Sequence, residues 1–141
     1  MIGLPGETPE LAEQTIKYAI ELDPDYAQFS ITTPFPGTKL YHEVKAGKWG
    51  KLVTEDFSEF QTFNVVFLPD GYKNKQELWS MSRKAFRSFY FRPKFIINKI
   101  AKVRSWEDIK RYYKGGRALV GGFAFGPMPA HVREKTGRNP L

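Results

Sequence analysis

The 141-residue sequence contains no cysteine and only two histidines, His42 and His131. Without thiols the chain cannot form a disulfide, a thiolate zinc site, a cysteine nucleophile or an iron–sulfur cluster held by its own side chains. The two histidines are far apart in the sequence, so we expect each on an exposed loop or helix rather than in a metal site. The chain therefore offers little of the chemistry that proteins use to hold transition metals.

A long uncharged apolar run is also absent. No segment reaches the roughly 20 residues that a membrane-spanning helix needs, and none has the charged start and cleavage site of a signal peptide. We therefore expect a cytoplasmic location, with a peripheral position at the membrane as an alternative. With 41% hydrophobic and 16% aromatic residues, the chain has enough apolar material for one modest core.

Charge is divided unevenly along the chain. Residues 1–72 hold 5 Lys/Arg against 11 Asp/Glu, whereas residues 73–117 hold 14 against 3. The net charge of +7 therefore hides an acidic first half and a strongly basic middle.

The first half predicts a β–α–β order. The start "MIGLPGE" resembles the end of a buried strand, and Thr8 can cap a helix that begins at Pro9 and continues to about Leu22. The segment "YAQFSIT", residues 26–32, alternates apolar and polar residues, which predicts a strand. Helical crossovers of this kind are typical of parallel sheets.

The alternation in residues 26–32 has two explanations. A barrel strand would turn Ala27, Phe29 and Ile31 toward outer helices and its polar residues toward a wet lumen. An edge strand with one solvated face would give the same pattern. The pattern alone does not choose between them.

The loop "TPFPGT" follows at the carboxyl end of this strand, which is where parallel α/β folds place their active sites. Thr38 is expected to cap a short helix to about Val44. Residues 48–72 are expected to be irregular, with "NVVFL" as a short strand.

The basic middle predicts three helices. Asn74 and Glu77 have capping-box spacing, and Pro93 marks where the first helix stops or bends before a second one.

A third helix is expected to start at Ser105, with Asp108 completing its cap, and to end at Gly115 and Gly116. Residues 118–141 are rich in glycine and proline and are expected to be mostly unstructured.

The sequence matches general catalytic and anion-binding motifs only weakly. The turn "GLPGET" before a helix could hold an anion on free backbone N–H groups, but an ordinary strand-to-helix turn has the same sequence features. Glu7 and Glu10 are expected to complement the helix dipole rather than to catalyse. Ser30 has neither a nearby histidine nor a nucleophile elbow, so a hydrolase triad is not predicted.

Two longer stretches carry a more specific signal. "MIGLPGETPELAEQTIKYAIELDPDYAQFSITTPFPGTKLYHE" resembles the late barrel part of radical S-adenosylmethionine enzymes with a cobalamin-binding domain, the group that includes the anaerobic magnesium-protoporphyrin ester cyclase. "KAFRSFYFRPKFI" resembles the C-terminal helical segment of the same family. The resemblance covers roughly residues 1 to 100.

The resemblance implies an α/β fold made of the last βα units of a partial, TIM-like (β/α) barrel, followed by an all-helical extension. It implies S-adenosylmethionine, a four-iron four-sulfur cluster and cobalamin as cofactors of the family. The matching motif positions that it places beside S-adenosylmethionine or the substrate are Gly3, Leu4, Gly6, Ser30, Thr32 and Thr33.

The resemblance also implies a division of the chain. Residues 1–46 would be a C-terminal fragment of the barrel, 47–72 an irregular connection, 73–117 a basic helical extension and 118–141 a tail. The family's three-cysteine loop and cobalamin domain have no counterpart here, so we expect this chain alone to be inactive.

The position of Met1, inside an apparent strand, predicts a separately encoded or truncated portion of such an enzyme. Its partner would be the missing N-terminal half of the barrel. Without that partner we expect the chain to be marginally folded or to aggregate, because a severed sheet edge exposes unpaired backbone groups. A pure assembly module remains a further alternative.

Residues 73–117 support an alternative function, because Lys and Arg are interleaved with Phe, Tyr and Trp. This pattern is typical of segments whose partner is an anionic membrane surface and, less strongly, of segments that bind nucleic acid. The simplest explanation is that the aromatic residues are core and the charges form a solvated face.

Overall fold

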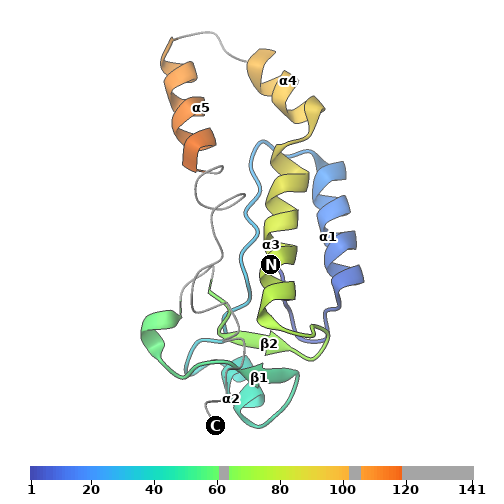
Figure 1. The fold of residues 1–141 in the computed structure, drawn as a ribbon, viewed down its shortest axis with the longest axis vertical. Helices are drawn as coiled ribbons and strands as arrows, with labels where there is room; N and C mark the ends of the chain where they lie inside the picture. Colours follow the sequence, from blue (N-terminus) through green and yellow to red (C-terminus); the bar gives the residue numbers. More distant parts are fainter. Residues whose placement is uncertain (61–63, 102–105, 119–141) are drawn as a thin grey trace, which may run out of the picture.

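The computed structural model describes residues 1–60, 64–101 and 106–118 (Figure 1). Its elements, in chain order, are α1 (Pro9–Leu22), α2 (Lys39–Lys45), β1 (Gly50–Leu52), the 3-10 turn η1 (Phe57–Glu59), β2 (Phe67–Pro69), α3 (Lys75–Tyr90), α4 (Pro93–Ala101) and α5 (Trp106–Ala118).

Helix α1 begins and ends as the sequence predicts. The hydroxyl of Thr8 accepts a hydrogen bond from the Leu11 N–H at 3.5 Å, and Asp23 closes the helix in the left-handed conformation at φ 45°. The buried face of α1 contains Ala12 and Ile16. Local cap and periodicity signals were therefore sufficient to define this helix.

Residues 26–33 are extended, but they form no named strand. Their one pairing is a parallel bridge between Ile31 and Ile2, in which the Ile2 N–H donates to the Ser30 carbonyl at 2.8 Å and the Thr32 N–H donates to the Ile2 carbonyl at 2.9 Å. The predicted strand over residues 26–32 is thus reduced to a bridge, because the residues before α1 offer little backbone to pair with. The parallel sense agrees with the predicted β–α–β order.

The part of the chain predicted as irregular contains a small sheet. Strands β1 and β2 pair antiparallel, with Lys51 opposite Leu68, and they form the two-stranded sheet that the structure shows in its described part. The predicted strand at residues 64–68 is therefore shifted to Phe67–Pro69, and β1 was missed. Helix α2 packs beside β1 and is capped by the Thr38 hydroxyl, as predicted.

Helix α3 supplies much of the core. The Asn74 side chain accepts from the Glu77 N–H at 2.8 Å, while the Glu77 carboxylate accepts from the Lys73 N–H at 2.7 Å, so the predicted reciprocal cap forms one residue earlier than usual. The apolar residues that recur at helical spacing along α3, Leu78, Met81, Ala85 and Phe89, are all buried.

Helix α3 packs on α1 and along the extended segment (Figure 1). The Ser82 hydroxyl donates to the Phe29 carbonyl at 3.3 Å. The Tyr90 hydroxyl donates to the Ala27 carbonyl at 2.7 Å and accepts from the Ala27 N–H at 3.1 Å. Side chains of α3 therefore satisfy backbone groups that a neighbouring strand would otherwise pair.

Arg92 joins the end of α3 to the end of α1. Its guanidinium donates to the Ile20 carbonyl at 2.8 Å and to the Asp23 carboxylate at 2.9 Å, while its Nε donates to the Phe89 carbonyl at 2.8 Å. One side chain thus closes two helix ends with charge-assisted bonds.

Helix α5 runs further than predicted. It continues to Ala118, so Gly115 and Gly116 lie inside the helix and do not end it. The predicted cap at Ser105 lies outside the described residues, as does the predicted unstructured tail over residues 118–141 apart from Ala118, the last residue of α5. Helices α4 and α5 lie at the end of the molecule opposite β1 and β2 (Figure 1).

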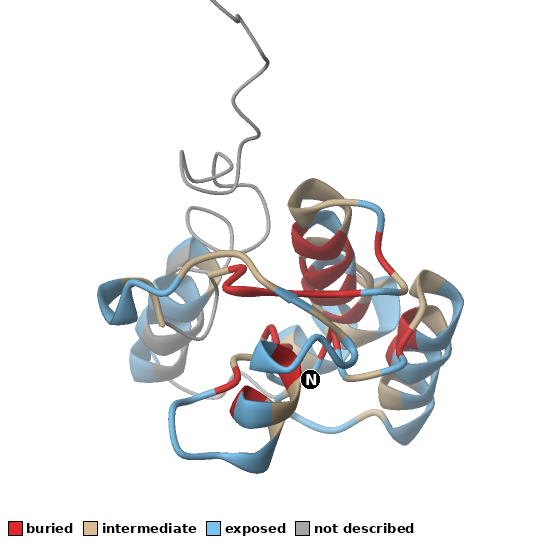
Figure 2. Cartoon of the chain, turned by 90° about the horizontal axis from the view of Figure 1, so that it is seen from below, coloured by how far each residue is buried: buried red, intermediate tan, exposed pale blue. Residues whose placement is uncertain are grey.

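The apolar core cluster of the described residues includes side chains from Ile2 to Phe89. It contains side chains of α1, the extended segment, the β2 region and α3, and in Figure 2 the buried residues lie on the inward sides of these elements. Helix α3, which lies in the predicted extension over residues 73–117, shares this cluster with residues of the predicted barrel fragment 1–46.

Candidate functional site

The first turn of the chain folds around the carboxylate of Glu7. This buried side chain accepts hydrogen bonds from the N–H groups of Gly3 and Leu4, the latter at 2.8 Å, and the Glu7 N–H donates to the Leu4 carbonyl at 2.9 Å. Gly3 has a φ of +80°, which favours glycine. The turn "GLPGE" is therefore closed on itself by its own acid.

This arrangement decides between the two explanations of the turn. An anion cradle needs free N–H groups, but those of Gly3 and Leu4 are bound to Glu7. Glu7 also lies before the cap residue Thr8 and faces back into the loop rather than along α1. The expected dipole role fits Glu10 instead, whose pKa is lowered mainly by the Thr8 hydroxyl.

The other three predicted site residues lie on the extended segment. The Thr32 hydroxyl donates to the Ile2 carbonyl at 3.1 Å and is buried. The Ser30 hydroxyl accepts from the Gln28 amide at 3.1 Å. The Thr33 hydroxyl oxygen is buried and has no hydrogen-bond partner.

The parallel bridge brings these residues and the first turn together. Ser30 and Thr32 flank Ile31, which pairs with Ile2, the residue before Gly3. Leu4 and Gly6 lie at the surface, and a side-chain carbon at Gly6 would meet nothing within 4 Å. Of the six predicted site residues, Thr33 is the one whose buried side-chain oxygen has no hydrogen-bond partner.

The loop before α3 covers the same turn and was not predicted as part of it. A side-chain carbon at Gly71 would lie 2.1 Å from the Glu7 carbonyl oxygen, so the two backbones touch there. The adjacent Tyr72 is buried, its hydroxyl has no hydrogen-bond partner, and burial, assisted by the charge of Glu7, raises its pKa above the ordinary value. The glycine at position 71 was the one sequence signal of this close approach.

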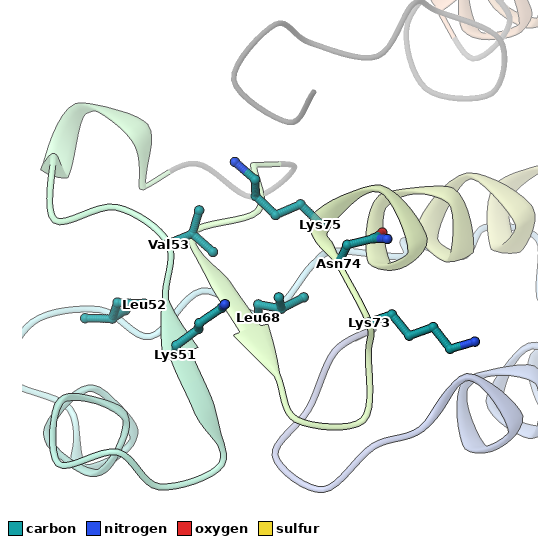
Figure 3. Close-up of a pocket in the computed structure, with 7 residues that line it drawn as sticks. All are labelled: Lys51, Leu52, Val53, Leu68, Lys73, Asn74 and Lys75. Atoms are coloured by element: carbon teal, nitrogen blue, oxygen red, sulfur yellow. The ribbon is translucent and has the colours of Figure 1, made fainter. Parts of the chain in front are cut away.

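A separate hollow of about 330 Å³ lies between the β1–β2 sheet and the start of α3 (Figure 3). Lys51, Lys73 and Lys75 line it together with Asn74. Figure 3 shows that the three ammonium groups point in different directions and do not meet at one point. None of the six predicted residues lines this hollow.

Metal ligands are not gathered in the described part of the chain. No group of three or more His, Asp or Glu side chains there could hold an ion. His42 is exposed on α2, as predicted, and His131 lies outside the described residues. Within the same described residues, no helix is long and apolar enough to cross a bilayer.

Three known proteins share sequence similarity with this chain. The chain is 40% identical over 115 residues to an uncharacterized methyltransferase of Pyrococcus horikoshii, which is 82% of this chain and 24% of that protein. It is 28% identical to the anaerobic magnesium-protoporphyrin IX monomethyl ester cyclases of Rubrivivax gelatinosus, over 96 residues, and of Cereibacter sphaeroides, over 92 residues. The predicted resemblance to the cyclase group is thus confirmed as sequence similarity.

The chain spans a quarter or less of the length of these relatives, at 24%, 16% and 14%. No family model and no solved structure matches it. The similarity is therefore confined to one segment of each relative.

Proposed function

We propose that this chain is the C-terminal part of a cobalamin-type radical S-adenosylmethionine enzyme and contributes one side of its cofactor and substrate site. The similarity to a methyltransferase and to two ester cyclases carries this proposal. In such enzymes S-adenosylmethionine, when bound beside a reduced cluster, supplies a carbon-centred radical for hydrogen abstraction from the substrate.

The chain's own residues do not fit the cluster. A four-iron four-sulfur cluster of this family is held by cysteine thiolates, and this sequence has none. No step of the proposed function therefore runs through a cluster on this chain. The missing N-terminal part of the barrel would have to hold it.

The residues fit a nucleoside-type ligand at one point. The Thr33 hydroxyl is buried, lacks a partner and follows the residues that pair with Ile2. Buried polar groups are normally hydrogen-bonded, so an unpaired hydroxyl at this edge is suited to a ligand group such as a ribose hydroxyl or a carboxylate. Gly3, Leu4, Ser30 and Thr32 already have internal partners, and we assign them to shaping the edge.

The backbone arrangement supports the barrel part of the proposal. Ile2 and Ile31 pair in parallel across the helix α1, which is the connection that a β/α barrel repeats. Phe29 and Ile31 are buried, with Phe29 against rings of α3, while Gln28 on the other side is exposed. One face of the segment is therefore covered by helices, as both the barrel strand and the edge strand require.

A chimera tests the proposal without requiring the isolated chain to be active. The matching 115-residue segment of the Pyrococcus protein would be replaced by this chain, and S-adenosylmethionine cleavage would be measured anaerobically with a chemical reductant. We expect both the unchanged relative and the chimera to bind and cleave the cofactor. An active relative and an inactive but folded chimera would contradict the proposal.

Thr33→Val in the same chimera tests the site. We expect about a fivefold to tenfold weaker binding of S-adenosylmethionine, since one hydrogen bond to a ligand contributes about 1 kcal/mol. Thr15→Val is the matched control, because the Thr15 hydroxyl lies on the exposed side of α1 and donates to the Leu11 carbonyl. If the two substitutions weaken S-adenosylmethionine binding equally, Thr33 does not contact the cofactor.

A further inference from the structure

The interleaved aromatic and basic residues of the chain's middle separate into two groups in the structure. The aromatic residues of α3, including Trp79, Phe86 and Phe89, are core. The simplest explanation of the pattern, aromatic core with solvated charges, therefore holds for α3. It does not hold for α5, whose aromatic residues Trp106 and Tyr113 are exposed, and α4 leaves its isoleucines exposed.

Helix α4 turns its apolar side away from the body. Phe95 packs against the rings of Phe89 and Tyr90 at centroid distances of 5.5 and 5.4 Å, and Lys99 reaches Asp25 at 2.6 Å. These two contacts, one turn apart, fix which side of α4 faces α3 and the extended segment.

The isoleucines of α4 occupy the outer side. At 3.6 residues per turn, Ile96, Ile97 and Ile100 form one stripe beyond the Phe95–Lys99 side, and they are 42%, 64% and 66% exposed. None of the residues of α4, all of which the structure describes, is buried. An amphipathic helix normally buries its apolar stripe, so the exposed stripe marks α4 as a candidate docking surface.

Helix α5 repeats the pattern. Trp106, Ile109 and Tyr113 are spaced along one side of the helix and are all exposed. Lys110 and Lys114 are exposed beside them. Because both stripes are exposed, α4 and α5 do not cover each other in this structure.

We propose that the α4 stripe, Ile96, Ile97 and Ile100, together with the aromatic side of α5, docks on the surface of an anionic lipid bilayer. Charge selects this partner, because residues 93–117 hold eight Lys/Arg against two Asp/Glu. Both lysines of α4 pair with acids of the body, so the exposed lysines of α5 are the ones that contact headgroups. The exposed isoleucines enter the acyl boundary, and Trp and Tyr suit the interface.

Nucleic acid fits this face less well. Sequence-independent binding to single strands uses aromatic rings on which bases stack, and in α3 those rings are in the core. Trp106 and Tyr113 of α5 are exposed and can stack on bases, but the most exposed apolar side chains of α4 are aliphatic and cannot. The exposed surface thus favours lipid over RNA.

The test is co-sedimentation of the full 141-residue chain with sucrose-loaded vesicles of phosphatidylcholine and phosphatidylglycerol in equal parts. We expect binding that falls at least tenfold on pure phosphatidylcholine and weakens strongly in about 0.5 M salt. A blue shift of tryptophan fluorescence on binding is also expected, because Trp106 would leave water. Absence of pelleting with the anionic vesicles would overturn the proposal.

A matched pair of double variants distinguishes docking by the α4 stripe from a general effect of the chain's net charge. Ile97→Glu with Ile100→Glu should lower anionic vesicle binding at least tenfold. Tyr18→Glu with Leu22→Glu changes the net charge equally on α1, where the two side chains are 62% and 61% exposed, and should have a much smaller effect. Equal losses in the two double variants would leave only nonspecific charge and would contradict docking by α4.

Two further measurements control for misfolding and for RNA binding. Circular dichroism checks that each variant keeps its helix content, and Ile97→Ser with Ile100→Ser serves if the glutamates disturb the fold; it should still weaken binding. Labelled single-stranded RNA is tested in parallel. Tight RNA binding that the α4 substitutions weaken, together with weak vesicle binding, would make this face a nucleic-acid surface instead.

Discussion

The carboxylate of Glu7 binds the backbone N–H of Gly3 from within the same turn, and a second bond to the Leu4 N–H holds it there. The acid is buried, and the loop carrying Gly71 packs directly on its backbone. Glu7 therefore organises the strand-to-helix turn on which Ile2 and its pairing with Ile31 depend.

Glu7→Ala should destabilise the fold by about 1–3 kcal/mol, because two backbone donors, one of them buried, lose their acceptor. Urea denaturation followed by circular dichroism measures this change. Glu10→Ala is the control, since Glu10 is exposed and close by in the sequence. A loss no larger than that of the control would mean that water satisfies the two N–H groups.

Local signals predicted much of the helical structure. Thr8, Thr38 and Asn74 cap the helices that their positions indicate, because a cap depends on neighbours within four residues. The role of Glu7 could not be predicted in the same way. It requires the left-handed Gly3 and burial under the loop before α3, which are tertiary features.

The same limit applies to α4 and to the sheet. The sequence predicted a helix after Pro93, but the outward orientation of its isoleucines is set by Phe95 and Lys99 through contacts with distant residues. Strand β1 has three residues and its pairing depends on β2, so no local period identified it. Gly115 and Gly116 lie within α5 although glycine commonly follows a helix end.

Arg92→Lys should destabilise the fold by about 1–3 kcal/mol. Lysine cannot reproduce the planar set of donors that reaches Ile20, Asp23 and Phe89 together. Thermal or urea unfolding is the measurement. Lys94→Ala provides the comparison, because Lys94 also pairs with Asp23, at 3.4 Å, but is largely exposed, and such pairs contribute at most about 1 kcal/mol. Equal losses of stability in the two variants would show that only the positive charge near Asp23 stabilises the fold.

Thr32→Val and Thr33→Val should differ in stability although the residues are adjacent. Thr32 loses the bond from its hydroxyl to the Ile2 carbonyl, at an expected cost of about 1 kcal/mol. Thr33 loses no bond, and removing its buried unpaired hydroxyl should leave stability unchanged or slightly higher. Urea unfolding of the two variants checks the order. A destabilised Thr33→Val would point to an internal partner and weaken its assignment to a ligand.

Tyr72 should make the fold sensitive to alkaline pH. Burial, followed by the nearby charge of Glu7, raises its pKa above the ordinary value of 10.0. The unfolded chain loses this proton near pH 10 while the folded chain keeps it, so stability present below that pH is lost as the pH rises beyond it. Tyr72→Phe should remove this part of the decline and, near pH 8, should be at least as stable as wild type because the lost hydroxyl has no partner. Urea unfolding between pH 8 and 11 measures both effects, with Tyr18→Phe, on an exposed tyrosine, as the control. If both variants decline as steeply as wild type above pH 10, another group controls the alkaline transition.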